Sequence, residues 1–238
     1  MSSPAPGAQH DRVASEPGWA RELNERHGPP ALEPGEPLEE PLWETVKRVA
    51  LTPRAGMVAL GRDVDAGRKG VLVSVTYGLA AAVIAAGQAA FGYPPDTDLT
   101  AGVLFALAVL PLFVLGTLLS AYVLRLAIPE GLDRRLGTAF GRLSLAWFVP
   151  SSVLLITGIV DIALLASGLV NAQQLSNFYL DSDRIALLLG VVSLWPLGVT
   201  AVAIRVATER NWFIVVLLLV VTTLVAAMPS LLLIPLAS

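Results

Sequence analysis

Long apolar runs separated by short polar connections fill the chain from about residue 70 onward. A helix needs about 20 consecutive apolar residues to cross the hydrocarbon core of a bilayer, and short connections place successive helices antiparallel. The polar segment 171–183 (NAQQLSNFYLDSD) is expected to be a connection between the third and fourth helices. The pattern therefore predicts an all-α polytopic membrane bundle, residues 70–238, with five transmembrane helices at 70–92, 101–128, 143–170, 184–207 and 211–236.

The segment 42–69, directly before the first apolar run, has the pattern of two short amphipathic helices. Apolar residues recur at helical spacing in its first half, and Thr52 followed by Pro53 predicts the start of a second helix. Six basic and three acidic residues occur in this segment, and each basic residue near an anionic lipid surface contributes about 1 kcal/mol. We expect the two helices to lie at the membrane interface, the alternative being a cytosolic cap on the bundle. The residues expected to contact lipid are Trp43, Lys47, Arg48, Arg54 and Arg62.

The first 41 residues differ from both of these regions. They contain eight prolines, eight acidic residues and three arginines, with few large apolar side chains. Such a segment cannot bury enough apolar surface to offset the entropy of ordering it. It also has no basic start followed by an apolar run, as a signal peptide would have. We expect a disordered, acidic and proline-rich cytosolic tail that stays in the mature protein.

Composition and charge sharpen this interpretation. Hydrophobic residues make up 55% of the chain and charged residues 15%, well below the roughly 25% charge that covers a soluble domain. If the five helices alternate in direction, fifteen of the sixteen Lys and Arg residues fall on one side. Because basic residues in short loops stay in the cytoplasm, we expect a multi-pass plasma-membrane protein with a cytoplasmic N-terminus and an exoplasmic C-terminus.

One acidic residue, Asp161, lies deep within a predicted transmembrane helix. A carboxylate there costs a few kcal/mol or more unless it faces the bundle and is paired or protonated. Counting from the cytoplasmic end places Asp161 and Gln88 in the outer half of the membrane, where Arg184 is the cation that could approach them. The sequence predicts an intramembrane polar cluster, either functional or a structural hydrogen bond, formed by Gln88, Asp161, Arg184 and Ser230.

Small residues recur every four positions on the first two predicted transmembrane helices. This spacing lets another helix approach closely. Packing within the chain is the simpler interpretation, and contact with a second copy or another membrane protein is the alternative. The residues expected to form these faces are Gly78, Ala82, Ala86, Gly116 and Ser120.

The sequence offers little for catalysis. Both histidines, His10 and His27, lie in the predicted tail, and the chain has no cysteine, so the membrane part lacks the usual metal ligands and general bases. No predicted helix carries the paired carboxylates of intramembrane aspartyl chemistry. With a pI near 5.4 and no predicted basic face, nucleic-acid binding is also not expected. We expect a non-enzymatic protein without a cofactor.

Three segments resemble the Yip1-domain family of five-span membrane proteins. The segment LTPRAGMVAL (51–60) is similar to the family's leader before the first helix, and GTAFGRLSLAWFVPSSVLLITGIVDI (137–162) is similar to its polar run into a mid-helix proline. The segment LWPLGVTAVAIRVATERNW (194–212) resembles its fourth helix and basic turn. The resemblance implies five helices with a cytosolic N-terminus. Eukaryotic members act in vesicle traffic and contact prenylated Rab GTPases, but their Asp-Leu-Tyr-Gly-Pro string is absent here.

Two functions remain open at this point. The first is an organising or adaptor subunit whose partners are the lipid bilayer and other membrane proteins or a second copy. The second is a transporter or channel component that uses the polar layer around Asp161 and helices kinked at prolines. Prolines occur in four of the predicted transmembrane helices, at Pro111, Pro150, Pro196, Pro229 and Pro235.

Overall fold

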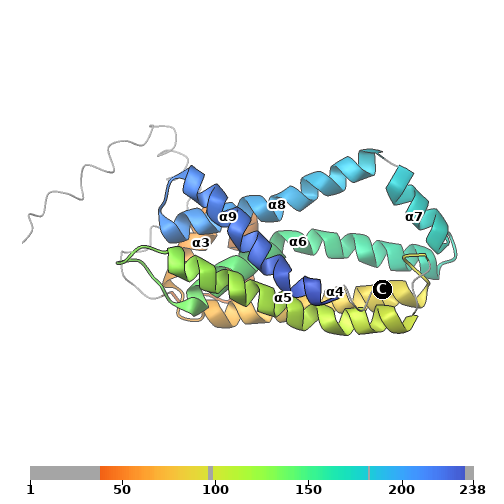
Figure 1. The fold of residues 1–238 in the computed structure, drawn as a ribbon, viewed down its shortest axis with the longest axis horizontal. Coiled ribbons are helices and arrows are strands. Elements are labelled where there is room, and N and C mark those ends of the chain that lie inside the picture. The colour runs from red at the N-terminus through yellow and green to blue at the C-terminus, as the bar shows by residue number, and fades with distance from the viewer. Residues whose placement is uncertain (1–37, 96–98, 182, 234–238) are drawn as a thin grey trace, which may run out of the picture. The chain divides into compact units, whose positions relative to one another are not determined.

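The computed structural model describes residues 38–95, 99–181 and 183–233, and the helical class predicted from the sequence is confirmed for these residues (Figure 1). No β-strand occurs among them; one isolated bridge joins Leu38 to Asp63. Most of the predicted tail, including the whole of 1–37, lies outside the described residues. The elements are α2 Leu42–Leu51, α3 Pro53–Arg62, α4 Ala66–Ala90, α5 Leu99–Ala127, α6 Leu136–Ala166, α7 Ala172–Asp181, α8 Asp183–Thr208, α9 Trp212–Ala227 and the 3-10 helix η2 Met228–Leu233.

The two short helices α2 and α3 meet at Thr52, as the sequence predicts. Pro53 occupies the first turn of α3, where a missing backbone N–H costs nothing. A Cβ built on Gly56 would lie 2.9 Å from backbone atoms of Val49, so the two helices approach each other at a glycine. Both helices contact α6, and α3 also contacts α8. The pair is therefore packed onto the long helices.

Helices α4, α5 and α6 form a closely packed group. Helix α4 packs against both α5 and α6. Glycines line the α4–α6 seam: a Cβ on Gly70 would lie 2.7 Å from the Cα of Gly141, and one on Gly67 would lie 3.0 Å from the Cα of Gly137. Only glycine allows two helix backbones to come this close.

Three helices in the described part are long and apolar enough to cross a membrane, fewer than the five predicted. They are α4, residues Leu110–Ala127 of α5, and α6. The pair Leu194–Thr208 and Trp212–Ala227 would make a fourth if it forms one broken span, because the chain turns by 118° between them. Helix α9 has only 16 residues. It gives way to η2, where Pro229 removes a backbone donor that a longer α-helix needs.

The connection predicted at 171–183 is itself largely helical. Asn171 accepts a hydrogen bond from the backbone N–H of Gln174 at 2.8 Å, and Gln174 Oε1 accepts one from the N–H of Asn171 at 2.9 Å. This reciprocal pair is a capping box, which starts a helix by satisfying two free donors. Helix α6 ends before it, at Ala166, and Gly168 with φ of 70° turns the chain. Helices α3 and α7 lie at opposite ends of the long helices (Figure 1).

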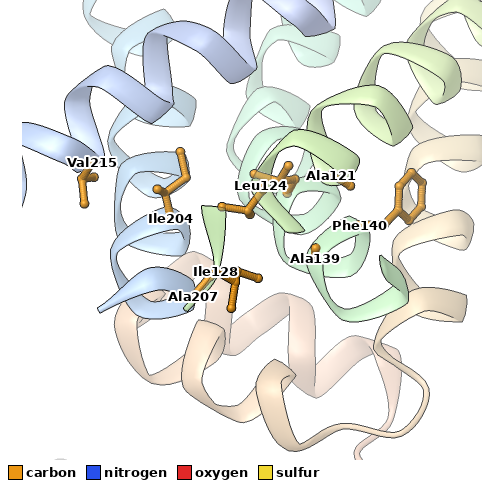
Figure 2. Close-up of a cluster of buried hydrophobic side chains, with 9 residues drawn as sticks. Ala121, Leu124, Ile128, Ala139, Phe140, Ile204, Ala207 and Val215 are labelled. Atoms are coloured by element: carbon orange, nitrogen blue, oxygen red, sulfur yellow. The ribbon is translucent and has the colours of Figure 1, made fainter. Parts of the chain in front are cut away.

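Two clusters of buried apolar residues lie at the α2–α3 end of the long helices. The first joins α5, α6, α8 and α9; Figure 2 shows Leu124, Ile128 and Ile204 at its centre. The second contains Val49 and Met57 together with residues of α4, α6 and α8. Many large apolar side chains elsewhere on the long helices are exposed, as expected for surfaces in contact with lipid.

Candidate functional site

The predicted carboxylate Asp161 lies in a hydrogen-bonded cluster contributed by three helices. Its side chain is 5% exposed. Oδ1 accepts a hydrogen bond from the Tyr179 hydroxyl on α7 at 2.6 Å, and Oδ2 accepts one from Gln88 Nε2 on α4 at 3.2 Å. The structure thus brings together Gln88 and Asp161, as the sequence predicts. The hydrogen bonds connect α4, α6 and α7 at the end of the bundle away from α2 and α3.

Local packing explains why Gln88 reaches Asp161. A Cβ on Gly87 would lie 2.7 Å from Ile162 Cδ1, and one on Gly158 would lie 2.5 Å from Ile84 Cγ2. These small residues let the last turns of α4 lie directly against α6. An amide side chain one residue beyond Gly87 is then within hydrogen-bonding distance of a carboxylate on the facing helix.

Tyr179 is the cluster member that sequence reasoning missed. The polarity of 171–183 predicts a connection, and the capping box at Asn171 is the local signal for the helix that carries Tyr179. Burial, the hydrogen bond to Asp161 and the negative charge of that carboxylate all raise the pKa of Tyr179. The hydroxyl therefore keeps its proton at physiological pH and donates a hydrogen bond to Asp161. The side chains of the other two predicted members, Arg184 and Ser230, lie outside the described residues.

The chemistry available to this cluster is hydrogen bonding between helices. Each carboxylate oxygen already accepts one hydrogen bond, so much of the cost of burying Asp161 is offset. In the described part of the chain, no three His, Cys, Asp or Glu residues gather as metal ligands would. The described contacts are those of a structural link between three helices.

The predicted small-residue faces lie against other helices of the same chain. A Cβ on Gly78 would collide with Leu110 of α5, and one on Gly116 would collide with the backbone of Ala226 on α9. Ser120 donates a hydrogen bond to the carbonyl of Thr222 on α9 at 2.7 Å. Ala82 and Ala86 are half-buried. Gly78, Gly116 and Ser120 are therefore covered within the chain and are not open to a second copy.

A second polar network fixes α2 and α3 to the long helices. Lys69, in the first turn of α4, forms a short ion pair with Asp63 and donates a hydrogen bond to Thr45 Oγ1 on α2 at 3.2 Å. Lys69 is 6% exposed and Asp63 is 1% exposed. The buried guanidinium of Arg142 on α6 donates to the Met57 carbonyl on α3 at 3.2 Å. Spacing along the chain does not predict these contacts, because Thr45 and Lys69 are 24 residues apart and Met57 and Arg142 are 85 residues apart.

The residues predicted to contact lipid fall into two groups. Trp43, Lys47 and Arg54 are exposed, and the first is 69% exposed. The Arg48 guanidinium instead lies 2.6 Å from the Glu40 carboxylate in a partly buried ion pair, and Arg62 is half-buried. The first three remain available to a lipid surface, whereas Arg48 is engaged within the chain.

The basic turn between α8 and α9 contains a further group of charged and aromatic side chains. Arg205 on α8 lies with its Cζ 5.7 Å from the ring centroid of Trp212, the first residue of α9. Both side chains line a hollow of about 510 Å³ together with Arg54 and Glu209. The hollow opens between α3, α8 and α9.

Comparison with family models, curated proteins and solved structures found no match for this chain. The resemblance to Yip1-domain proteins stays a prediction.

Proposed function

We propose that this chain is an integral membrane protein that acts as an organising or adaptor subunit, presenting α2 and α3 as a fixed surface for a protein partner. The observation that supports this most directly is the buried network of Lys69, Asp63 and Thr45. A helix pair that only rested on headgroups would need no buried ion pair with the bundle. A surface that must be recognised gains from being rigid, because less conformational freedom is then lost on binding.

Exposed apolar side chains on this pair support the same proposal. Trp43 is 69% exposed, Leu51 is 72% exposed and Val58 is 42% exposed. Since Gly78 and Gly116 are covered within the chain, the α2–α3 surface is the more accessible candidate for recognition. Part of it, around Trp43 and Arg54, is proposed to rest on lipid headgroups, as the charge pattern predicts.

The five-span arrangement, and with it the sidedness, is part of the proposal. Helix α8 has 26 residues, or about 39 Å at 1.5 Å per residue, which exceeds a hydrocarbon core of about 30 Å. Helix α9 and η2 add about 24 Å and about 12 Å. We propose α8 and α9–η2 as separate spans, with a cytoplasmic N-terminus and an exoplasmic C-terminus in the plasma membrane.

Single-cysteine labelling tests this topology, because the chain has no native cysteine. Ser238→Cys should be labelled by a membrane-impermeant maleimide on intact cells, whereas Ser2→Cys should be labelled only after the cells are permeabilised. A cysteine at Arg134 serves as the control for the proposed cytoplasmic side. Labelling of both ends from the same side would contradict five spans and favour one broken span for α8 and α9.

The adaptor function is tested by site-specific photo-crosslinking in cells. A photoreactive amino acid at Leu51 should give defined adducts with a protein partner, and the same residue at Leu118, exposed on α5, should not. Adducts of equal yield at both positions would contradict a recognition surface on α2 and α3.

Transport is the rival function, and the polar cluster makes it testable. Purified protein in liposomes should show no ion or solute flux above that of an Asp161→Asn variant. A flux that requires Asp161 would overturn the adaptor proposal and favour a transporter or channel component.

A further inference from the structure

The hollow between α3, α8 and α9 contains a combination of groups suited to one class of ligand. The residues that line it are two arginines, Arg54 and Arg205, together with Glu209, Trp212 and three valines. Its volume of about 510 Å³ lies in the range of small-molecule sites, roughly 300–1,000 Å³. The two arginines and one glutamate give the wall a formal charge of +1.

The two arginines are available to bind an anion. Within the described residues, neither Arg54 nor Arg205 forms an ion pair with a carboxylate. Guanidinium groups bind phosphate oxygens through two parallel hydrogen bonds, and these are stronger than neutral ones. Trp212 lies against Arg205. This contact holds the Arg205 guanidinium at the side of the hollow.

Glu209 adds a second recognition element, and it occupies a left-handed backbone position that glycine would adopt with less strain. It follows the last residue of α8 with φ of 52°, and its N–H donates to the Arg205 carbonyl at 2.9 Å. A residue other than glycine pays about 1 kcal/mol or more in this left-handed conformation. Glycine would end the helix with less strain but would leave no carboxylate beside the arginines.

The position of the hollow indicates a lipid. Tryptophan is typical of the membrane–water interface, and the exposed apolar surface of α9 begins directly after Trp212, with Phe213 81% exposed. Basic pockets between membrane helices bind lipid headgroups. Apolar side chains of the wall and of α9 would contact an acyl chain, which a soluble phosphate compound lacks.

We propose that this hollow binds the headgroup of an aminophospholipid, with the phosphate between Arg54 and Arg205 and the primary ammonium at Glu209. The proposal requires the membrane location proposed above but not the adaptor function. Its readout is lipid retained by the purified chain, so it can fail while partner crosslinking succeeds, and the reverse is also possible.

The experiment is native mass spectrometry of the full chain released from nanodiscs that contain equal amounts of phosphatidylethanolamine, phosphatidylglycerol and phosphatidylcholine. Wild type should retain phosphatidylethanolamine preferentially, because the ammonium of phosphatidylcholine is fully methylated and cannot donate hydrogen bonds. Arg54→Gln should reduce retention about tenfold, as expected for loss of a charge-assisted hydrogen bond. Arg125→Gln, an exposed arginine at the end of α5 outside this hollow, should leave retention unchanged.

Glu209→Gly separates recognition from folding. Because glycine favours the left-handed conformation, this variant should unfold at the same or a higher temperature than wild type while losing the preference for ethanolamine over choline. Glu209→Gln should lose the same preference. An unchanged preference in both variants, or equal effects of Arg54→Gln and Arg125→Gln, would overturn the proposal. So would full displacement of the lipid by millimolar phosphoethanolamine, which would indicate a soluble ligand.

Discussion

The buried pair Lys69 and Asp63 allows a sharp test of how α2 and α3 are held. Both side chains are almost fully buried, and Lys69 also donates to Thr45. Removing one member of a buried ion pair leaves an uncompensated charge and typically costs about 3–5 kcal/mol. Lys69→Met should therefore lower the free energy of unfolding by about that amount. Asp63→Asn should have a similar effect, because it leaves the ammonium without its counter-ion.

The double variant Asp63→Asn/Lys69→Met is the decisive member of the series. It contains no buried charge, and replacement of a whole ion pair is often nearly neutral. The coupling free energy of the double-mutant cycle should therefore be about 2 kcal/mol or more. Stability is measured by reversible unfolding of the purified chain in mixed micelles. Arg68→Met, at the exposed neighbouring position, is the control and should change stability by less than about 0.5 kcal/mol.

The reasoning would be refuted if both single variants changed stability by less than about 1 kcal/mol and their effects were additive. Such a result would mean that the pair is solvated and that apolar contacts alone hold α2 and α3. Site-directed labelling gives an independent readout. A spin label at Leu51 should become more mobile in Lys69→Met and should return toward wild-type mobility in the double variant.

Three further predictions concern other parts of the chain. Tyr179→Phe leaves one Asp161 oxygen without its donor and should lower the free energy of unfolding by about 1 kcal/mol. Amide exchange in α7, measured by mass spectrometry, should become faster. Unchanged exchange would contradict a link between α6 and α7. Gly70→Ala should lower the free energy of unfolding by about 1–3 kcal/mol, because the added methyl group overpacks against Gly141. The control Gly198→Ala has nothing within 4 Å of the added Cβ. It should be neutral or slightly stabilising in thermal unfolding. Burial opposes ionisation of Asp133, but hydrogen bonds from Arg135 outweigh it and lower the pKa of Asp133 to about 2. The stabilisation that the ionised Asp133 contributes is therefore present above about pH 4 and is lost as the pH falls toward 2. The difference in melting temperature between wild type and Asp133→Asn should shrink over that pH range.

Local signals made much of this helical arrangement predictable. Thr52 and Pro53 mark the break between α2 and α3, because a proline at the first helical position needs no backbone donor and is favoured there. Helical depth counting placed Gln88 beside Asp161, and these side chains are hydrogen-bonded in the structure. Both inferences depended on spacing along the chain or on the rise of a helix, which the sequence contains directly.

Other features depended on information that spacing does not contain. The capping box at Asn171 was a local signal, but the high polarity of 171–183 favoured a connection and concealed the helix with Tyr179. Lys69 and Asp63 lie in a charged segment of the sequence, and their burial accompanies a contact with Thr45, which is 24 residues from Lys69. The hollow at Arg205 and Trp212 depends on the turn between two helix axes, which no periodicity encodes.

The length of α6 has a mechanical consequence for the α2–α3 surface. Its 31 residues extend about 46 Å, whereas a hydrocarbon core takes up about 30 Å. The excess of roughly ten residues corresponds to its first turns, where every residue from Thr138 to Ala146 is buried, and α2 and α3 pack against this helix. In a bilayer, helix α6 would thus act as a spacer that sets the level of α2 and α3 at the headgroups. Deleting one turn would shift that surface by about 5 Å toward the hydrocarbon core.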